Sequence, residues 1–237
     1  MHVDMNLERE NRPQEEIEAL QRLSLVWRDT VWGLNGNPER ADLAFEDIVE
    51  RYRTGDGRAY HNIMHVDRML AFVESFIHLS HNPAALVAAI FGHDIVYEPQ
   101  SGMNELESAN IFASILEALE VDEDQINEVK RLILLTKNHK TTDSDIDGKI
   151  LIDSDYEILA SPDEIYERYS QQGIYAEYVL SGKTPLEAYK RGRGLYLDGW
   201  IQDALNDRLF LNPEVMTAFK EQALKNFTRE RLFLETL

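Results

Sequence analysis

The stretch AAIFGHDIVYE (88–98) decides how this chain folds, because a polar pair interrupts an otherwise apolar run. The pair is His93 and Asp94, and apolar residues flank it on both sides. The spacing predicts a helix over residues 83–97 with His93 on its apolar face and Asp94 at the edge of that face. Burying a histidine and an aspartate costs free energy unless a partner compensates them. The nature of that partner decides whether the chain is only a helical domain or a metalloprotein.

The composition limits the classes of function. The chain has 237 residues, of which 43% are hydrophobic and 28% charged, enough to bury a substantial core in one large or two small domains. Its 43 Asp and Glu residues outnumber 24 Lys and Arg, so the formal net charge is −19. This charge argues against nonspecific nucleic-acid binding and against attraction to anionic membranes. An anionic substrate would need a metal ion or a few well-placed basic residues.

The sequence contains no cysteine, which excludes disulfides and thiolate metal sites. The polar segment over residues 1–16 lacks the apolar core of a signal peptide. The longest uncharged apolar run, PAALVAAIFG (83–92), is too short to span a bilayer. We therefore expect a soluble cytoplasmic protein with no membrane partner.

Apolar residues recur at three- and four-residue steps along most of the chain, which is typical of amphipathic helices. The expected helices cover residues 14–32, 37–52, 61–80, 83–97, 105–120, 121–137, 149–160, 161–182, 184–205 and 212–237. A strand is an alternative for the first half of 149–160. No repeat or long linker divides the chain. The pattern predicts an all-α fold, a single helical bundle with a metal-site core at 38–160 and C-terminal helices at 162–237 packed on it.

Further polar residues fall on the inner faces of these helices. His61 and His65 are four residues apart, so both are expected to project from one side of their helix toward the core. In the helix over 149–160, periodicity places Asp155 on the apolar face and leaves Asp153 for a role behind the ligands or for capping. An alternative is that both aspartates simply cap a helix end.

The inward residues form a mixed nitrogen and oxygen donor set, which suits one divalent ion such as Mn²⁺, Fe²⁺, Ni²⁺, Co²⁺, Zn²⁺ or Mg²⁺. The members of this set are His65, His93, Asp94 and Asp155. Ligands on separate helices of a bundle are a sound way to hold such an ion.

Four segments together resemble the HD superfamily, and more closely its branch of predicted metal-dependent phosphohydrolases, which are small all-helical proteins. These segments are YHNIMH (60–65), FGHDIVYEP (91–99), NELESA (104–109) and LIDSDYEILA (151–160). The segments EY (177–178), RGR (191–193) and EQALKNFTRE (221–230) also fit that branch.

The resemblance implies a metal bound by His65, His93, Asp94 and Asp155. It places His61, Asn104 and Glu105 behind the ligands or in contact with the attacking water. Asn104 also fits a helix N-cap, and Glu105 also fits a first helical turn. Asp94 or Glu105 would accept the proton of the attacking water.

Three further residues are candidates for contact with the substrate. Binuclear members of the superfamily usually have two more histidines between the HD pair and the last aspartate, whereas only His139 lies there in this sequence. We therefore expect one ion, with His139 and Lys140 facing the substrate. A solvated helix end is the alternative for that pair. Arg193 is expected either to offset phosphate charge or to belong to a basic patch on a helix surface.

These observations predict a metal-dependent phosphohydrolase in which a metal-activated water attacks the phosphorus of a nucleotide or another small phosphoester. One alternative is a regulatory protein that binds a nucleotide or metal without catalysis. A less favoured alternative is a di-iron oxygenase of the same fold, which would need two irons. The apolar segment RLFLETL (231–237) is expected to pack internally or to form a homodimer contact.

Overall fold

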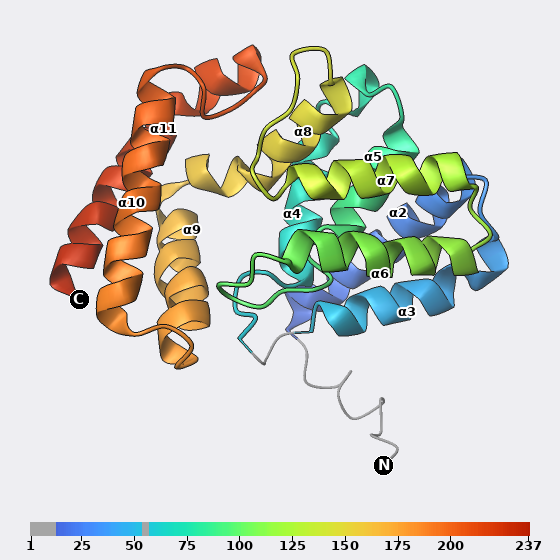
Figure 1. The fold of residues 1–237 in the computed structure, drawn as a ribbon, viewed down its shortest axis with the longest axis horizontal. Coiled ribbons are helices and arrows are strands. Elements are labelled where there is room, and N and C mark those ends of the chain that lie inside the picture. Colours follow the sequence, from blue (N-terminus) through green and yellow to red (C-terminus); the bar gives the residue numbers. More distant parts are fainter. Residues whose placement is uncertain (1–12, 54–56) are drawn as a thin grey trace.

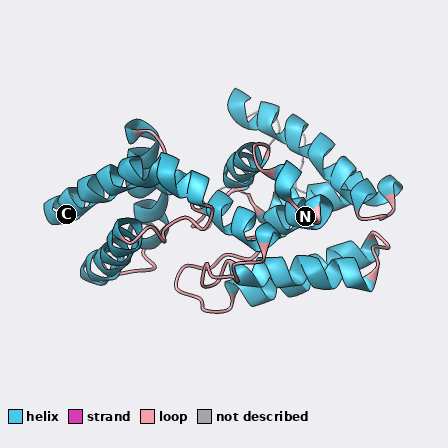
Figure 2. Cartoon of the chain, turned by 90° about the horizontal axis from the view of Figure 1, so that it is seen from above, coloured by secondary structure: helices cyan, strands magenta, loops and turns pink. Residues whose placement is uncertain are grey.

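The computed structural model describes residues 13–53 and 57–237. Within these ranges the chain forms helices and loops and contains no β-strand, as Figures 1 and 2 show. The prediction of an all-α fold is therefore confirmed. The alternative of a strand in residues 149–160 is wrong, because Ile146–Asp155 is an α-helix.

The helices form two groups, which lie side by side in Figure 1. The first group comprises α2 (Gln14–Gly33), a 3₁₀ turn (Pro38–Arg40), α3 (Ala41–Arg51), α4 (Ile63–Val73), a 3₁₀ turn (Ile77–Leu79), α5 (Pro83–Gly92), α6 (Asn104–Ala118), α7 (Glu123–Leu135) and α8 (Ile146–Asp155). The second comprises α9 (Asp163–Glu167), wide π-type turns (Arg168–Ile174 and Ala176–Leu180), α10 (Leu186–Leu205) and α11 (Pro213–Thr236). A 3₁₀ turn (Glu157–Ala160) joins them.

The apolar core of the first group includes residues of α2 as well as those of the helices that follow it. Trp27 of α2 is fully buried, and its indole N–H donates to the carbonyl oxygen of Ala41 at 3.0 Å. Its ring contacts Phe91 of α5 and Phe112 of α6, with centroids 5.2 and 5.9 Å away. Such aromatic pairs fix how the helices sit on one another.

A second apolar cluster fills the space between α9, α10 and α11. Phe72 of α4 and Phe76, which follows that helix, pack against both clusters. Tyr60 also packs against the second cluster, and its ring centroid lies 4.6 Å from that of Tyr169. The C-terminal helices therefore pack against the segment that carries His61 and His65.

Helix α4 begins later than expected. The side chain of Asn62 accepts a hydrogen bond from the N–H of Met64 and caps the helix, which starts at Ile63. His61 therefore lies in the loop before α4 and does not share a helix face with His65. The expectation that both histidines project from one helix is wrong for this reason.

Helix α5 ends earlier than expected, at Gly92, and His93 is its C-cap. A Cβ at Gly92 would lie 2.5 Å from the ring of Phe112, so only glycine allows α5 and α6 to approach this closely. Side chains then replace the helical hydrogen bonds of the next residues. The Ser108 hydroxyl bonds to both the N–H and the carbonyl oxygen of Val96. Residues 93–97 thus form an irregular segment, which contradicts the expected helix to residue 97.

Helix α8 fastens two distant segments through buried carboxylates. Asp147 accepts hydrogen bonds from the backbone N–H groups of His81 and Asn82 at 2.9 and 3.0 Å, just before α5. Asp153 accepts bonds from the N–H groups of Leu211 and Asn212 at 2.6 and 2.8 Å, just before α11. Asp155 is the last residue of this helix.

None of the described helices combines the length and the apolar character that a bilayer crossing requires.

Candidate metal centre

Three helices bring a histidine–aspartate cluster together where the first group of helices meets the second. We use this name for His65, His93, Asp94 and Asp155. His65 lies in the first turn of α4, His93 caps the C-terminus of α5 and Asp94 follows it. Asp155 ends α8, which packs against both α4 and α5.

The polar atoms of the cluster face one another. His65 Nε2 lies 3.3 Å from His93 Nε2 and 3.1 Å from Asp155 Oδ1. Asp94 Oδ2 lies 3.3 Å from His93 Nε2. One polar atom from each of His65, His93 and Asp155 lies within 4.8 Å of the other two. Asp94 is not part of this three-residue group and is placed by its contact with His93. Atoms that bind one ion at about 2.0–2.2 Å lie about 3.0–3.5 Å apart, so the three distances of 3.1–3.3 Å are those expected between ligands of a single ion.

The outer ring nitrogens also fit a metal site. His65 Nδ1 lies 3.0 Å from the hydroxyl of Tyr60, and His93 Nδ1 lies 2.9 Å from the carbonyl oxygen of Ile90. The Ile90 carbonyl accepts the Nδ1 hydrogen of His93, and the Tyr60 hydroxyl can accept that of His65. Both Nε2 atoms would then present lone pairs to each other, an arrangement that a cation or a proton between them stabilises. Histidines that bind metals usually donate their other N–H in this way. The donor set therefore fits a divalent ion.

In the metal-free protein a proton balances the charges of the cluster. Burial by itself lowers the pKa of His93, but the charges of Asp94 and Asp155 outweigh it and raise that pKa to about 9. Burial alone would raise the pKa values of both aspartates, yet the neighbouring histidines hold them below their usual range. A metal ion would compete with that proton for the same atoms.

The cluster is closed on its histidine side and open on its aspartate side. The side chains of His65 and His93 are each 1% exposed, whereas those of Asp94 and Asp155 are 15% and 18% exposed. The carboxylates are therefore partly in contact with solvent, while the imidazoles are buried.

His139 lies next to the cluster, from the loop between α7 and α8. Its Nε2 is 2.8 Å from Asp155 Oδ2, and its ring stacks on Tyr156 with centroids 4.3 Å apart. Its backbone φ is +49°, a left-handed conformation that is uncommon for a residue other than glycine. The neighbouring Lys140 is exposed. The structure thus brings His139 to an expected ligand, Asp155.

His61 lies on another side of the cluster, and its ring centroid is 6.0 Å from that of His65. His61 Nδ1 is 2.6 Å from Glu177 Oε2, and the ring stacks on Tyr97 at 3.9 Å. Burial by itself lowers the pKa of His61, but the charge of Glu177 outweighs it and raises that pKa. Glu177 itself is completely buried.

Other expected site residues bond elsewhere. Asn104 bonds through its side-chain amide to the N–H and carbonyl oxygen of Glu98, each at 3.0 Å, and thereby holds the loop after the cluster. Glu105 lies in the first turn of α6, and its Oε2 is buried without a hydrogen-bond partner among the described residues. The carboxylate of Asp153 binds the backbone before α11, and burial raises its pKa to about 7.

Arg193 lies in the second group of helices and is almost completely buried. Its Nε and Nη2 bond to the Glu230 carboxylate at 2.6 and 3.1 Å, and Nη2 also bonds to the Tyr169 hydroxyl at 3.3 Å. The expected surface patch is therefore wrong for Arg193, and its charge is already compensated.

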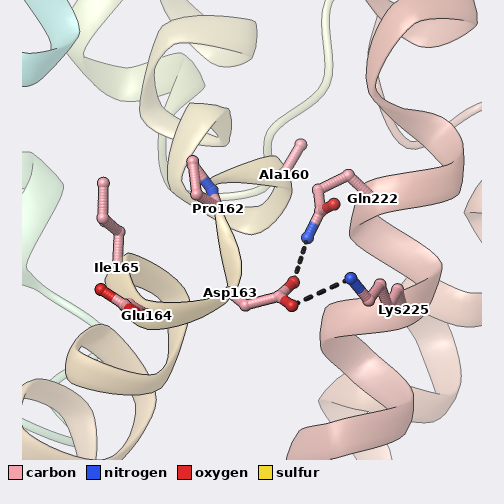
Figure 3. A pocket seen from close by; sticks show the side chains of 7 residues that line it. All are labelled: Ala160, Pro162, Asp163, Glu164, Ile165, Gln222 and Lys225. Carbon is pink, nitrogen blue, oxygen red and sulfur yellow. Dashed lines mark hydrogen bonds and ion pairs between the residues drawn. The ribbon is translucent and has the colours of Figure 1, made fainter.

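An open pocket lies apart from the cluster, between the start of α9 and α11 (Figure 3). Its lining residues are Ala160, Pro162, Asp163, Glu164, Ile165, Gln222 and Lys225. Asp163 bonds to Gln222 and Lys225 across it, each at 2.9 Å, and to Arg229 at 2.6 Å. These groups compensate one another.

Sequence reasoning gave no site role to several residues that shape the surroundings of the cluster, among them Arg58, Tyr60, Tyr97 and Glu177. Tyr60 and Tyr97 lie within motifs that carried the resemblance, YHNIMH and FGHDIVYEP, but an aromatic residue in such a run predicts core packing equally well. Glu177 lies in EY (177–178), which also fitted the resemblance, but it is more than 100 residues from His61 in the sequence and no periodicity links the two.

Comparisons with protein-family models, with curated proteins and with solved structures gave no match.

Proposed function

We propose that this chain is a metal-dependent phosphohydrolase of the HD type, which acts on a nucleotide or another small phosphoester. One observation carries the proposal: His65, His93 and Asp155, from separate helices, aim polar atoms at one point. The donor set, its spacing and the open aspartate side support a divalent ion there. The sequence motifs around these residues support the choice of reaction.

A divalent ion held by the histidine–aspartate cluster would polarise a phosphoryl oxygen and lower the pKa of a water molecule beside it. The residues of the chain have three tasks around that ion. Tyr60 and the Ile90 carbonyl hold the two imidazoles in place. His139 holds the second oxygen of Asp155. The proton that water loses passes to a partly exposed group near the cluster, and Asp94 and His61, whose side chains are 15% and 19% exposed, are the candidates.

The charge of the substrate also needs compensation, because the chain carries a net charge of −19. The ion supplies part of it. Lys140 is exposed next to His139 and is the basic residue we propose for the phosphate. We propose no such contact for Arg193, since the Glu230 carboxylate already binds its guanidinium.

The test is turnover by the purified protein loaded with Mn²⁺, Co²⁺, Ni²⁺, Zn²⁺, Fe²⁺ or Mg²⁺. The substrates are mono-, di-, tri- and cyclic nucleotides and small phosphoesters, with phosphate or nucleoside release as the readout. We expect turnover with at least one ion, and its loss in Asp155→Asn. His78→Ala is the matched control, because His78 is an exposed histidine outside the cluster.

Other outcomes identify the alternatives. Saturable nucleotide binding without turnover would show a regulatory binding protein. Two irons per chain together with O₂ consumption would show an oxygenase. Absence of bound metal together with absence of turnover for every ion would contradict the proposal.

A further inference from the structure

Glu177 belongs to the second group of helices, yet its completely buried carboxylate serves the loop before α4. Glu177 Oε1 accepts hydrogen bonds from the backbone N–H groups of Tyr60 and His61 at 2.7 and 2.9 Å. Its Oε2 lies 2.6 Å from His61 Nδ1 and accepts a bond from the Tyr97 hydroxyl at 3.1 Å. Burying a carboxylate is costly, and four hydrogen bonds are needed to satisfy it.

These contacts fix the imidazole of His61 in position, orientation and tautomer. A carboxylate only accepts hydrogen bonds, so the hydrogen of the neutral ring lies on Nδ1 and the lone pair lies on Nε2. Tyr97 stacks on the ring at 3.9 Å with an angle of 21° between the planes, which prevents rotation. None of the hydrogen bonds among the described residues uses His61 Nε2.

The two histidines that flank the cluster are therefore in different situations. The Nε2 of His139 is occupied by Asp155, an expected metal ligand. His61 is held by a carboxylate that lies outside the cluster, and its side chain keeps 19% exposure. A histidine oriented by a buried carboxylate, with its other nitrogen open, is the arrangement used for proton transfer in hydrolases.

We propose that His61 is a catalytic residue that transfers the proton during hydrolysis, and that Glu177 is the residue that positions it. This inference rests on the proposed function. As the oxygen of the attacking water bonds to phosphorus, its proton moves to His61 Nε2. As the bond from phosphorus to the leaving oxygen breaks on the opposite side, that oxygen takes a proton from water, and His61 returns its own proton to water. The ring ends as it began, so no additional acid or base is consumed.

The kinetic test compares the loaded wild type with His61→Ala and Glu177→Gln on whichever substrate the wild type hydrolyses. General acid–base catalysis contributes about 10²–10⁴-fold, so His61→Ala lowers kcat by about 100-fold or more. KM changes by no more than about threefold, because binding does not depend on proton transfer. Metal content remains that of the wild type, and added imidazole restores part of kcat. Glu177→Gln lowers kcat at least about tenfold, since an amide donor facing Nδ1 moves the ring hydrogen to Nε2.

Asp147→Asn is the matched control for Glu177→Gln. Asp147 is also a buried carboxylate that accepts two consecutive backbone N–H groups, but no histidine side chain bonds to it among the described residues. We expect Asp147→Asn to lower the melting temperature and to leave kcat unchanged. A kcat of Glu177→Gln that falls no further than that of Asp147→Asn would show a purely structural role.

A second readout needs neither metal nor substrate. The chain has seven histidines, so ¹H–¹⁵N correlation spectra of the imidazoles can be assigned with His61→Ala. We expect His61 to carry hydrogen on Nδ1 in the metal-free wild type and to lose this preference in Glu177→Gln. The inference is overturned if His61 Nδ1 carries no hydrogen, or if His61→Ala keeps kcat within about threefold of an active wild type. A wild type without any turnover would instead refute the proposed function, and this inference with it.

Discussion

Each group of helices buries one cluster of charged side chains, and the two clusters are built differently. In the C-terminal group, Arg193 and Glu230 form a salt bridge at 2.6 Å, and the hydroxyl of Tyr166 bonds to the same carboxylate at 2.5 Å. Cation and anion are both supplied by the chain, and the side chains are 8% and 1% exposed. This pair is closed to solvent and internally balanced.

In the histidine–aspartate cluster, by contrast, the hydrogen bonds described for the carboxylates come from histidines. Two buried Nε2 atoms face each other, and the carboxylates reach toward solvent. In the function we propose, these side chains are the ligands of a cation, and the partly exposed carboxylates leave one side of the cluster accessible. We expect the Arg193–Glu230 ion pair to stabilise the fold, and we expect the histidine–aspartate cluster to bind a cation from solution. Four predictions separate these two roles.

The largest effect is expected in the closed pair. Breaking a buried ion pair leaves the other charge uncompensated, so Arg193→Met lowers the free energy of unfolding by about 3–5 kcal/mol. For a chain of this size that is a fall of about 6–20 °C in melting temperature. Calorimetry of the variant measures it, and bound metal per folded chain should equal that of the wild type.

The double variant Arg193→Met/Glu230→Leu is the control, because two apolar side chains leave no buried charge. It should recover much of the lost stability. A single variant as stable as the wild type would show that the pair does not hold the C-terminal helices together.

The second prediction concerns stabilisation by the ion. An ion present at 100 times its dissociation constant stabilises the folded state by about 2.7 kcal/mol, or about 5–10 °C in melting temperature. Adding Mn²⁺ or Co²⁺ to the metal-free protein should give this rise, and Asp155→Asn should abolish it. In Arg193→Met the melting temperature without the ion is lower, and adding the ion should raise it by the same amount as in the wild type. A rise of equal size in Asp155→Asn would place the ion elsewhere.

The third prediction tests the residue that joins the two regions. Tyr60 contacts Tyr169 of the C-terminal group and bonds to His65 Nδ1. Removing such an outer partner of a ligand costs about 10–100-fold in metal affinity. We expect Tyr60→Phe to weaken metal binding about tenfold by titration calorimetry, and to leave the fold intact by circular dichroism. Unchanged affinity would mean that Tyr60 only packs there.

The smallest effect is expected at the exposed ion pairs of Asp163. Hydrogen bonds from Lys225 and Gln222 and the charge of Arg229 lower the pKa of Asp163 to about 2. A carboxyl group with a lowered folded-state pKa adds stability above its unfolded pKa of about 4, and this stability is lost as the pH falls toward 2. Asp163→Asn should therefore be slightly less stable than the wild type at pH 7. The melting temperatures of Asp163→Asn and of the wild type should become equal as the pH falls from about 4 to 2. A difference between them that grows as the pH falls would contradict this prediction.

The sequence predicted most of the helices because their apolar spacing is regular. Periodicity did not separate the two aspartates of α8, because most residues of this helix are buried and Asp153 is less exposed than Asp155. The predicted helix boundaries are wrong where side chains form hydrogen bonds with backbone groups at the helix ends. The side chain of Asn62 sets the start of α4, and the hydroxyl of Ser108 bonds to the backbone of Val96 after the end of α5. Neither contact leaves a periodic pattern in the sequence. The resemblance included EY (177–178), but the role of Glu177 could not be predicted, because its partner His61 lies 116 residues away in the sequence.

The central claim is that His65, His93, Asp94 and Asp155 hold one ion. Metal content per chain by elemental analysis tests it most directly, after loading with Mn²⁺ or Co²⁺ and removal of the excess. We predict one ion per chain in the wild type and in His78→Ala, and less than about a tenth of an ion in Asp155→Asn, for a loss of at least about 100-fold in affinity. Equal metal content in Asp155→Asn and the wild type, or none in either, would contradict the claim.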